Sequence, residues 1–103
     1  MSELTDTSVE RLTQIFKVLG DPTRVRLLHA LTAREHSVGH LAIVLGVSPS
    51  AVSHQLRLLR GARVVRPRRA GRTVYYTLDD KHVLALFREG LRHALEDGGR
   101  AAR

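Results

Sequence analysis

The spacing of apolar residues changes partway along this chain, and the change limits the folds that it can adopt. As far as Gly61, apolar residues recur at the three- and four-residue intervals of helices, in four successive segments. Two short runs rich in β-branched and aromatic residues then follow, at 64–69 and 73–78, and they flank Gly71. Such runs around a glycine predict a β-hairpin. A final helical pattern ends near Glu96, so we expect a mainly α fold with one hairpin.

Capping residues place the ends of the predicted helices. Asp21 and Ser48 are each followed by proline, and they suit the N-caps of the second and fourth helices. Glycines suit the ends of the first, third and fourth helices, at Gly20, Gly46 and Gly61. The expected helices run from about Val9 to Leu19, from Pro22 past Leu31, from Ser37 or Val38 to Leu45, from Pro49 to about Arg60, and from Asp79 or Asp80 to about Glu96.

The length and composition are those of one small domain, because 103 residues bury only a modest core. We expect a flexible N-terminal arm over 1–7, a folded domain over 8–97 and a disordered tail over 98–103. The polar, acid-bearing N-terminus lacks the pattern of a signal peptide. The longest apolar stretch, Leu41 to Leu45, is far shorter than the ~20 residues of a membrane span. We therefore expect a cytoplasmic protein with no membrane partner, and the lack of cysteine excludes disulfides and thiolate sites.

The net charge of +7 comes from the middle of the chain. Residues 1–35 carry five acidic and five basic residues, and residues 79–103 carry the same numbers, so both ends are neutral. The segment 36–78 holds no acidic residue and seven arginines. Guanidinium groups without neighbouring carboxylates suit a phosphate backbone, since each neutralised phosphate releases counterions. Solubility alone does not require acids to be excluded locally, so the pattern favours nucleic acid as a partner.

The segment 41–60 has the layout of a helix-turn-helix, with a turn around Gly46. Its second helix opens with small polar residues that allow it to enter the major groove of DNA, and Gln55 suits a bidentate pair with adenine. Arginines follow where phosphates would lie, and the hairpin would form a wing that reaches the backbone or the minor groove. The predicted DNA-binding residues are Ser48, Ser50, Ser53, His54, Gln55, Arg57, Arg60, Arg68, Arg69 and Arg72.

Three stretches between Lys17 and Glu96 resemble the ArsR/SmtB family of metal-sensing winged-helix repressors: VLGDPTRVRLLHAL, LAIVLGVSPSAVSHQLRLLR and GRTVYYTLDDKH. The resemblance implies a winged helix-turn-helix that dimerises through its first and last helices. It further implies a homodimeric repressor that binds an imperfect inverted repeat in double-stranded DNA and releases it when an inducer binds. The interface residues expected on the two helices are Val9, Leu12, Phe16, Leu84, Phe87 and Leu91.

Members of this family differ in where they bind the inducer. Those that sense arsenic, cadmium or lead commonly use cysteines in the third helix, but Ser37 and Gly39 stand at the matching positions here. A soft-metal site at that helix is therefore excluded. The last helix instead matches the zinc site of the family at all four ligand positions. The resemblance thus implies that Zn²⁺, with Co²⁺ or Ni²⁺ less favoured, binds Asp80, His82, His93 and Glu96.

One helix cannot bring these four side chains to one ion. His82 and His93 are eleven residues apart, so they lie within about 20° on one face but are separated by a rise of about 16 Å. A Zn–N bond is only ~2.1 Å long. Two antiparallel last helices in a dimer would place Asp80 and His82 of one beside His93 and Glu96 of the other, at two equivalent sites. Each site would offer two imidazoles and two carboxylates, a tetrahedral set suited to zinc.

A metal that joins the two last helices would fix one arrangement of the two recognition helices. If that arrangement fits the operator less well than the free one, metal and DNA must oppose each other by linkage. The resemblance suggests a route in which coordinated His93 donates its second ring N–H to a backbone carbonyl near Arg63.

Other functions stay open at this point. The same fold could sense nickel, cobalt or a non-metal signal, although residues 1–28 hold no further histidine for nickel and none follows His93. A nonspecific architectural DNA protein would show no preference for an inverted repeat. An enzyme with a small-molecule substrate is disfavoured, because no nucleophile–base pattern, phosphate loop or catalytic zinc signature is present. The roles of His36 and His40 are left open.

Overall fold

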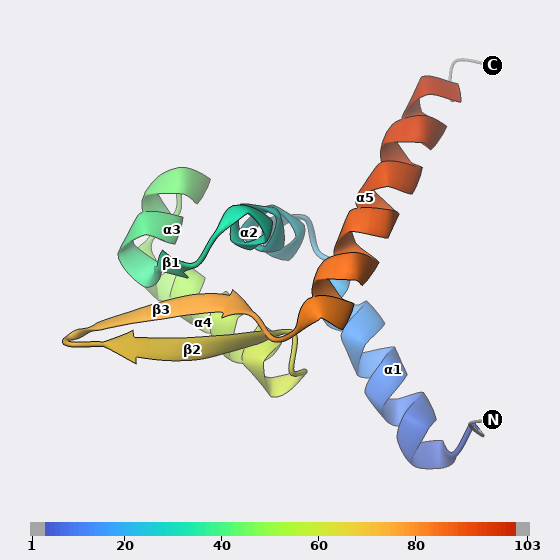
Figure 1. Ribbon diagram of the computed structural model, residues 1–103, viewed down its shortest axis with the longest axis horizontal. Coiled ribbons are helices and arrows are strands. Elements are labelled where there is room, and N and C mark those ends of the chain that lie inside the picture. Colours follow the sequence, from blue (N-terminus) through green and yellow to red (C-terminus); the bar gives the residue numbers. More distant parts are fainter. Residues whose placement is uncertain (1–3, 101–103) are drawn as a thin grey trace.

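The computed structural model describes the backbone of residues 4–100 and the side chains of residues 4–96. This part folds as a winged helix-turn-helix, as predicted. Helices α2, α3 and α4 and a small sheet form the body, while α1 and α5 extend from one side of it, opposite the tip of the hairpin (Figure 1). The elements are α1 (Asp6–Leu19), α2 (Pro22–Ala33), β1 (His36–Ser37), α3 (Val38–Leu45), α4 (Pro49–Gly61), β2 (Val65–Ala70), β3 (Thr73–Leu78) and α5 (Lys81–Arg100).

Each of the first four helices begins with a side-chain oxygen that accepts a hydrogen bond from the backbone N–H three residues later. These caps satisfy N–H groups that the helix itself leaves unpaired. The caps at Asp21 and Ser48, each followed by proline in the first turn, confirm the predicted starts of α2 and α4. Ser37 caps α3, and Gly46 ends it in the left-handed region with φ 69°, both as predicted.

The two terminal helices are longer than the sequence pattern predicts. Thr5 caps α1, so the helix begins at Asp6 and includes part of the segment expected to be a flexible arm. Helix α5 continues to Arg100 rather than ending near Glu96, because each added residue of a helix gains a backbone hydrogen bond. Residues 1–3 of the predicted arm and 101–103 of the predicted tail lie outside the described residues.

Helix α4 ends one residue later than predicted. Gly61 is its last helical residue, and Ala62 is the C-cap, with a backbone N–H that donates to the carbonyls of Leu58 and Arg60. The chain then turns through Arg63 in the left-handed region, with φ 60°, before it enters β2.

The hairpin lies at the predicted place, and a third strand extends it. Strands β2 and β3 pair in antiparallel register, and Gly71 turns between them with φ 63°. The two-residue strand β1 pairs with the other side of β3, opposite Tyr75 and Tyr76, which gives the order β1-β3-β2. Two residues carry no periodic signal, so the sequence does not predict β1. Because β1 leads directly into α3, the wing is joined to the helix-turn-helix by backbone hydrogen bonds.

One apolar core lies beneath the helix-turn-helix. The inner side of α4 is completely enclosed by side chains of α2, α3 and the strands. Burying a leucine or valine contributes about 1.5–3 kcal/mol, so this face determines which side of α4 remains in water. The largest fully buried side chains are Leu27, Leu28, Leu41, Val52, Leu56, Leu59, Val64 and Val65. No helix in the described part of the chain is long and apolar enough to cross a membrane.

Among the residues whose side chains are described, His36 is the one polar residue that is buried, with 6% of its surface exposed. Its Nε2–H donates to the carbonyl of Ala30 at 3.2 Å, so Nδ1 of the neutral ring is an acceptor. The Nδ1 atom of His36 lies 2.6 Å from Nδ1 of His40, so in this pair Nδ1–H of His40 is the donor. Burial, and next the neighbouring His40, lower the pKa of His36. The pair holds the start of α3 against the end of α2 with a neutral His36.

We predict that the free energy of unfolding decreases as the pH falls below 6.5, the ordinary pKa of histidine, since the unfolded chain accepts a proton that folded His36 resists. Replacing His36→Leu should reduce this loss. Denaturant unfolding between about pH 8 and about pH 5 measures it. His54→Leu, which removes an exposed imidazole, should keep the wild-type dependence. Equal pH dependence in the His36 variant and the wild type would contradict the prediction.

Candidate nucleic-acid interface and metal-ligand positions

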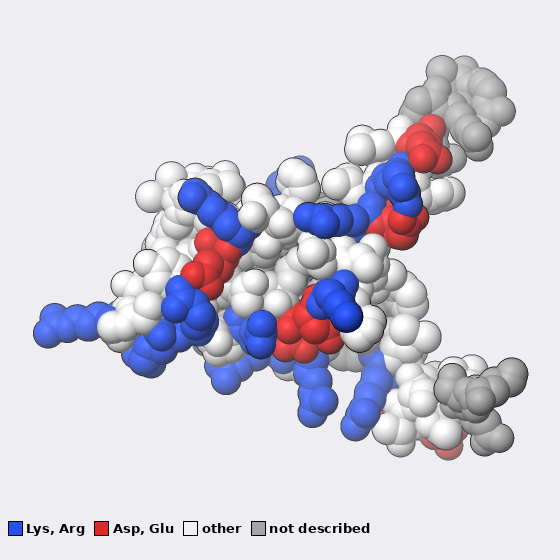
Figure 2. All heavy atoms as spheres, in the orientation of Figure 1, with Lys and Arg blue, Asp and Glu red and all other residues white. Residues whose placement is uncertain are grey.

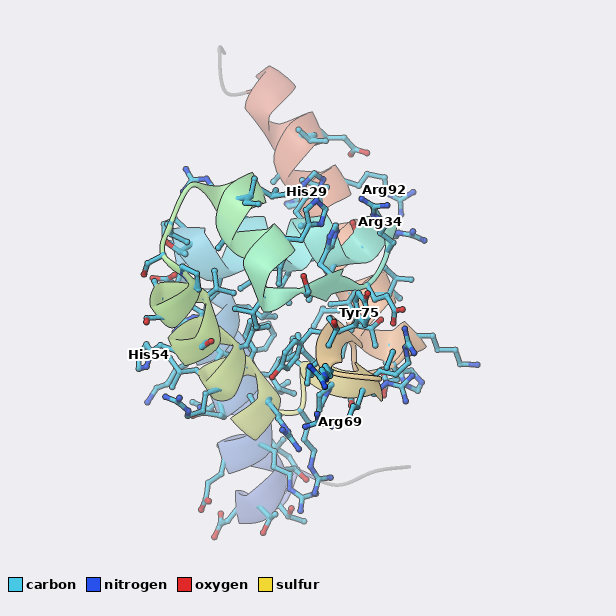
Figure 3. The ribbon with its side chains drawn as sticks, turned by 90° about the vertical axis from the view of Figure 1, so that its left-hand side faces the viewer. His29, Arg34, His54, Arg69, Tyr75 and Arg92 are labelled. Carbon is cyan, nitrogen blue, oxygen red and sulfur yellow. The ribbon has the colours of Figure 1, made fainter. Side chains whose placement is uncertain are left out.

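The outer side of α4 presents polar and basic side chains to solvent. Ser50, His54 and Arg57 are exposed and fall on one helical face, because they are four and three residues apart. Figure 3 shows His54 projecting from the outer side of α4. Ser53 is half-buried beside them, and Arg60 is exposed about one turn after Arg57. The structure thus brings most of the predicted recognition residues to one accessible face.

Two of the predicted recognition residues are held by the protein itself. The hydroxyl of Ser48 accepts a hydrogen bond from the backbone N–H of Ala51, at 3.1 Å, and serves as the helix cap. The amide oxygen of Gln55 accepts a hydrogen bond from Arg24 of α2, at 3.2 Å. Sequence patterns did not indicate Arg24, because its partner lies 31 residues away.

The arginines of the wing differ in their surroundings. Arg69 and Arg72 are exposed near the turn, whereas Arg68 forms a two-point ion pair with Glu35, with Nε 2.9 Å from Oε2. The guanidinium of Arg68 also lies over the ring of Tyr75, 5.3 Å from its centre. The hydrogen bond from Arg68 holds the pKa of Glu35 below its ordinary value. Arg68 is therefore partly neutralised within the subunit, which the sequence did not predict.

Basic side chains line one margin of the molecule. Figure 2 shows Lys and Arg at the tip of the wing and along the edge below the hairpin, while most acidic side chains are set back from this edge, some of them directly beside basic ones. The acid-free segment 36–78 supplies the wing and α4, so the segregation along the chain is also a segregation in space. Such a margin attracts a polyanion such as DNA.

The first two predicted metal ligands lie together at the start of α5. Oδ1 of Asp80 accepts hydrogen bonds from the backbone N–H groups of His82 and Val83, at 2.9 and 3.0 Å, so Asp80 caps the helix. Its other oxygen, Oδ2, lies 3.5 Å from Nδ1 of His82. The hydrogen bond from Val83 lowers the pKa of Asp80, and His82 lowers it further. Capping thus uses one carboxylate oxygen and leaves the second beside an imidazole.

This pair lies next to the end of the recognition helix. Asp80 and His82 line a cavity of about 480 Å³ together with residues 61–63 and with Arg11 and Gln14 of α1. The backbone N–H of Asp79 also donates to the carbonyl of Val64, at 2.9 Å. The segment that leads into α5 and the segment that follows α4 are thus joined by a backbone hydrogen bond, and both line this cavity.

The other two predicted ligands lie farther along α5. His93 and Glu96 are exposed, one turn apart on the outer part of the helix. Among the residues that the structure describes, three or more potential metal ligands of the types His, Cys, Asp and Glu do not gather in one place. A single subunit thus does not assemble the four-ligand set, and the set itself stays a prediction.

The projecting helices expose apolar side chains. Phe16 is 57% exposed, and apolar residues of α1, α2 and α5 surround a cavity of about 320 Å³ between them. Leu84 and Phe87, predicted to lie at the interface, are partly buried against the core within the subunit, and Phe87 stacks on His29 with the ring centres 6.4 Å apart. The exposed large apolar residues on the two helices are Val9, Leu12, Phe16, Leu86, Leu91 and Leu95.

The fold, the exposed polar face of α4 and the basic wing define a winged helix-turn-helix DNA-binding protein. The family model described as bacterial regulatory protein, arsR family, matches residues 21–66. The transcriptional regulator KmtR of Mycobacterium tuberculosis is 40% identical over 95 residues, which are 92% of this chain and 73% of KmtR. The chain belongs to the arsR family.

Two further comparisons agree. The transcriptional repressor SmtB homolog of Synechocystis is 49% identical over 87 residues, 84% of this chain. The chain spans 66% of that relative, just under two thirds of its length. The crystal structure of the antimony-specific repressor AntR superposes with a TM-score of 0.80 at 35% identity, covering 96% of this chain and 90% of AntR. The arsR family is one of bacterial regulatory proteins, so family membership makes this chain a transcriptional regulator rather than an enzyme.

We predict that the arginines of the wing contribute unequally to DNA affinity. Arg69→Met and Arg72→Met should each lower the slope of log affinity against log salt by about 0.9 for every phosphate that the arginine neutralises. Arg68→Met should lower it by clearly less, because Glu35 already neutralises this side chain. Fluorescence anisotropy with one duplex at several salt concentrations measures the slopes. An equal decrease for Arg68→Met would show that DNA displaces Glu35.

Proposed function

We propose that this protein is a metal-responsive transcriptional repressor that binds an inverted-repeat operator as a homodimer. Zinc would bind at two equivalent sites between the α5 helices and release the operator. The basic margin and the exposed face of α4 support the DNA-binding part. The exposed apolar residues of α1 and α5 support dimerisation through these helices, because water-exposed apolar area of this kind marks an interface.

The position of Asp80 and His82 carries the metal-responsive part of the proposal. Their cavity is shared with residues 61–63 at the end of the recognition helix and with α1, which belongs to the expected dimer face. A ligand bound there contacts both the DNA-reading element and the interface. Binding of a ligand there would therefore change the affinity for DNA, and binding of DNA would change the affinity for the ligand by the same factor.

The donor set fits a divalent cation of zinc type. Oδ2 of Asp80 remains available while Oδ1 caps α5, and the imidazole of His82 is already within 3.5 Å of it. His93 and Glu96 of the partner subunit would complete two nitrogen and two oxygen donors, whose two carboxylates balance the charge of the ion. Zinc would supply a bond between the subunits there. The exposure of all four side chains leaves them accessible to a second α5.

Metal binding and DNA binding then oppose each other through the relative placement of the two α4 helices. Recognition helices read successive major grooves about 34 Å apart, so their separation determines the fit to an inverted repeat. His93 has a further role in this proposal, because a metal-bound imidazole donates its second N–H to a nearby acceptor. The backbone carbonyls near Arg63, in the turn after α4, are the acceptors that the resemblance indicates.

We predict that His93→Ala abolishes the response to zinc while the apo protein keeps its DNA affinity, because His93 is exposed on α5, apart from the DNA-binding face. Operator binding with chelator or with zinc measures both properties. His29→Ala, which removes an imidazole that stacks on Phe87, is the control and should respond like the wild type. Loss of DNA binding by the apo His93 variant would contradict this assignment.

We predict that zinc binding requires the dimer. Phe16→Glu places a charge on the exposed apolar face of α1 and should yield a monomer that has lost high-affinity zinc binding. Ile43→Glu adds the same charge at a residue 80% exposed on α3, and should stay dimeric with two zinc ions per dimer. Sedimentation and zinc titration test both variants. A monomer that binds zinc as tightly as the wild type would exclude the intersubunit site.

Parallel titrations identify the inducer. DNA affinity with chelator, zinc, cobalt or nickel should fall most with zinc, since four N and O donors favour a tetrahedral ion. A stronger response to cobalt or nickel would assign the same site to those metals. No response to any of the three would indicate a repressor that senses a non-metal signal.

A further inference from the structure

Arg24 connects the end of α1 to the recognition helix. Its backbone N–H donates to the Asp21 cap, which fixes the residue in the first turn of α2. Its Nε–H donates to the carbonyl of Val18, at 2.8 Å, in the last turn of α1. The residue four positions after Val18 is Pro22, which has no N–H, so the guanidinium supplies the donor that the helix lacks there. The side chain is partly buried, and two hydrogen bonds hold its guanidinium.

The same guanidinium determines which way the Gln55 amide faces. Nη1 of Arg24 donates to Oε1 of Gln55, at 3.2 Å. An arginine has donors and no acceptor, so the amide oxygen is the atom that must face it. Oε1 and Nε2 occupy opposite corners of the planar amide, and the NH₂ group consequently points away from Arg24. Gln55 itself is half-buried and lies about 100° around α4 from His54, between the exposed side of the helix and its buried side.

This orientation changes what Gln55 can recognise. A bidentate pair with adenine uses the amide oxygen to accept from N6 and the amide nitrogen to donate to N7. With its oxygen turned to Arg24, Gln55 offers a donor, which suits acceptors on the base edge such as O6 and N7 of guanine or O4 of thymine. We propose that Arg24 is a positioning residue for base selection, which makes Gln55 a donor to acceptor-bearing base edges in the major groove. The proposal rests on the DNA-binding function proposed above.

Selection from a randomised double-stranded DNA library, followed by anisotropy on the selected site and its single-base variants, tests the proposal. The wild type should prefer guanine or thymine at one base pair in each half-site, and Gln55→Met should lose that preference. Arg24→Met should reduce the same preference by about tenfold, a typical value of one base contact. In the Gln55→Met background, adding Arg24→Met should change nothing further at that base pair.

Two controls separate positioning from charge. Arg24→Lys keeps the charge, but one ammonium at the end of a flexible chain does not reproduce the fixed fork that reaches Val18 and Gln55, so the base preference should also fall. Arg26→Met removes one charge from an exposed position on the same helix and should keep the wild-type preference. Thermal unfolding of each variant shows whether it folds, and Arg24→Lys and Gln55→Met still test the proposal if Arg24→Met does not.

Several results would overturn the proposal. One is an Arg24→Met variant whose affinity falls by the same factor for every DNA sequence, so that its base preference at each position is unchanged. Another is a decrease of about 0.9 in the salt slope, which would make Arg24 a phosphate contact. An unchanged base profile in Gln55→Met would show that Gln55 reads no base. If the wild type selects no inverted repeat, the proposed function fails, whereas a selected repeat with an unaltered Arg24→Met profile removes this proposal alone.

Discussion

The apolar contact between the inner face of α4 and the helices α2 and α3 is the interaction on which the rest of the structure depends. Val52, Leu56 and Leu59 are almost fully removed from water, and the opposite face of the same helix is consequently left to solvent. Truncating such a leucine to alanine typically costs about 2–5 kcal/mol, a large part of the stability of a small domain. The packing that stabilises the fold therefore also presents Ser50, His54 and Arg57 together.

A second constraint is the apolar surface of α1 and α5 that the core leaves exposed. A chain of this size buries only part of its apolar surface, and the projecting helices α1 and α5 keep large apolar residues in water. In the proposed dimer a second copy would cover them, and the helix that carries the four candidate metal ligands is one of the two helices that expose this surface. The proposed dimer interface and the proposed inducer site would thus be coupled, because both include α5.

The sequence predicted the elements that follow from local chemistry. Caps such as Asp21 and Ser48 determine helix starts through hydrogen bonds within one turn, and Gly71 permits the hairpin turn. A few adjacent residues are therefore sufficient to predict these features. The features that sequence reasoning missed depend on distant partners: β1 exists because β3 pairs with it, and the partners of Arg68 and Arg24 lie 33 and 31 residues away. Of the predicted interface residues, Val9, Leu12, Phe16 and Leu91 are exposed, whereas Leu84 and Phe87 are partly buried against the core of the subunit. Helical periodicity alone does not tell whether an apolar side chain faces its own core or another subunit.

The short strand β1 has a consequence for how a dimer of this protein senses DNA. Its pairing with β3 attaches the wing to the first residues of α3, so backbone hydrogen bonds connect the wing to the helix-turn-helix. If one subunit rotated relative to the other, α4 and the wing of each subunit would move together. The contacts of α4 with the major groove and those of the wing with the DNA backbone would then change at the same time. The quantity to which DNA binding by the proposed dimer responds would then be the helical phase between the two half-sites.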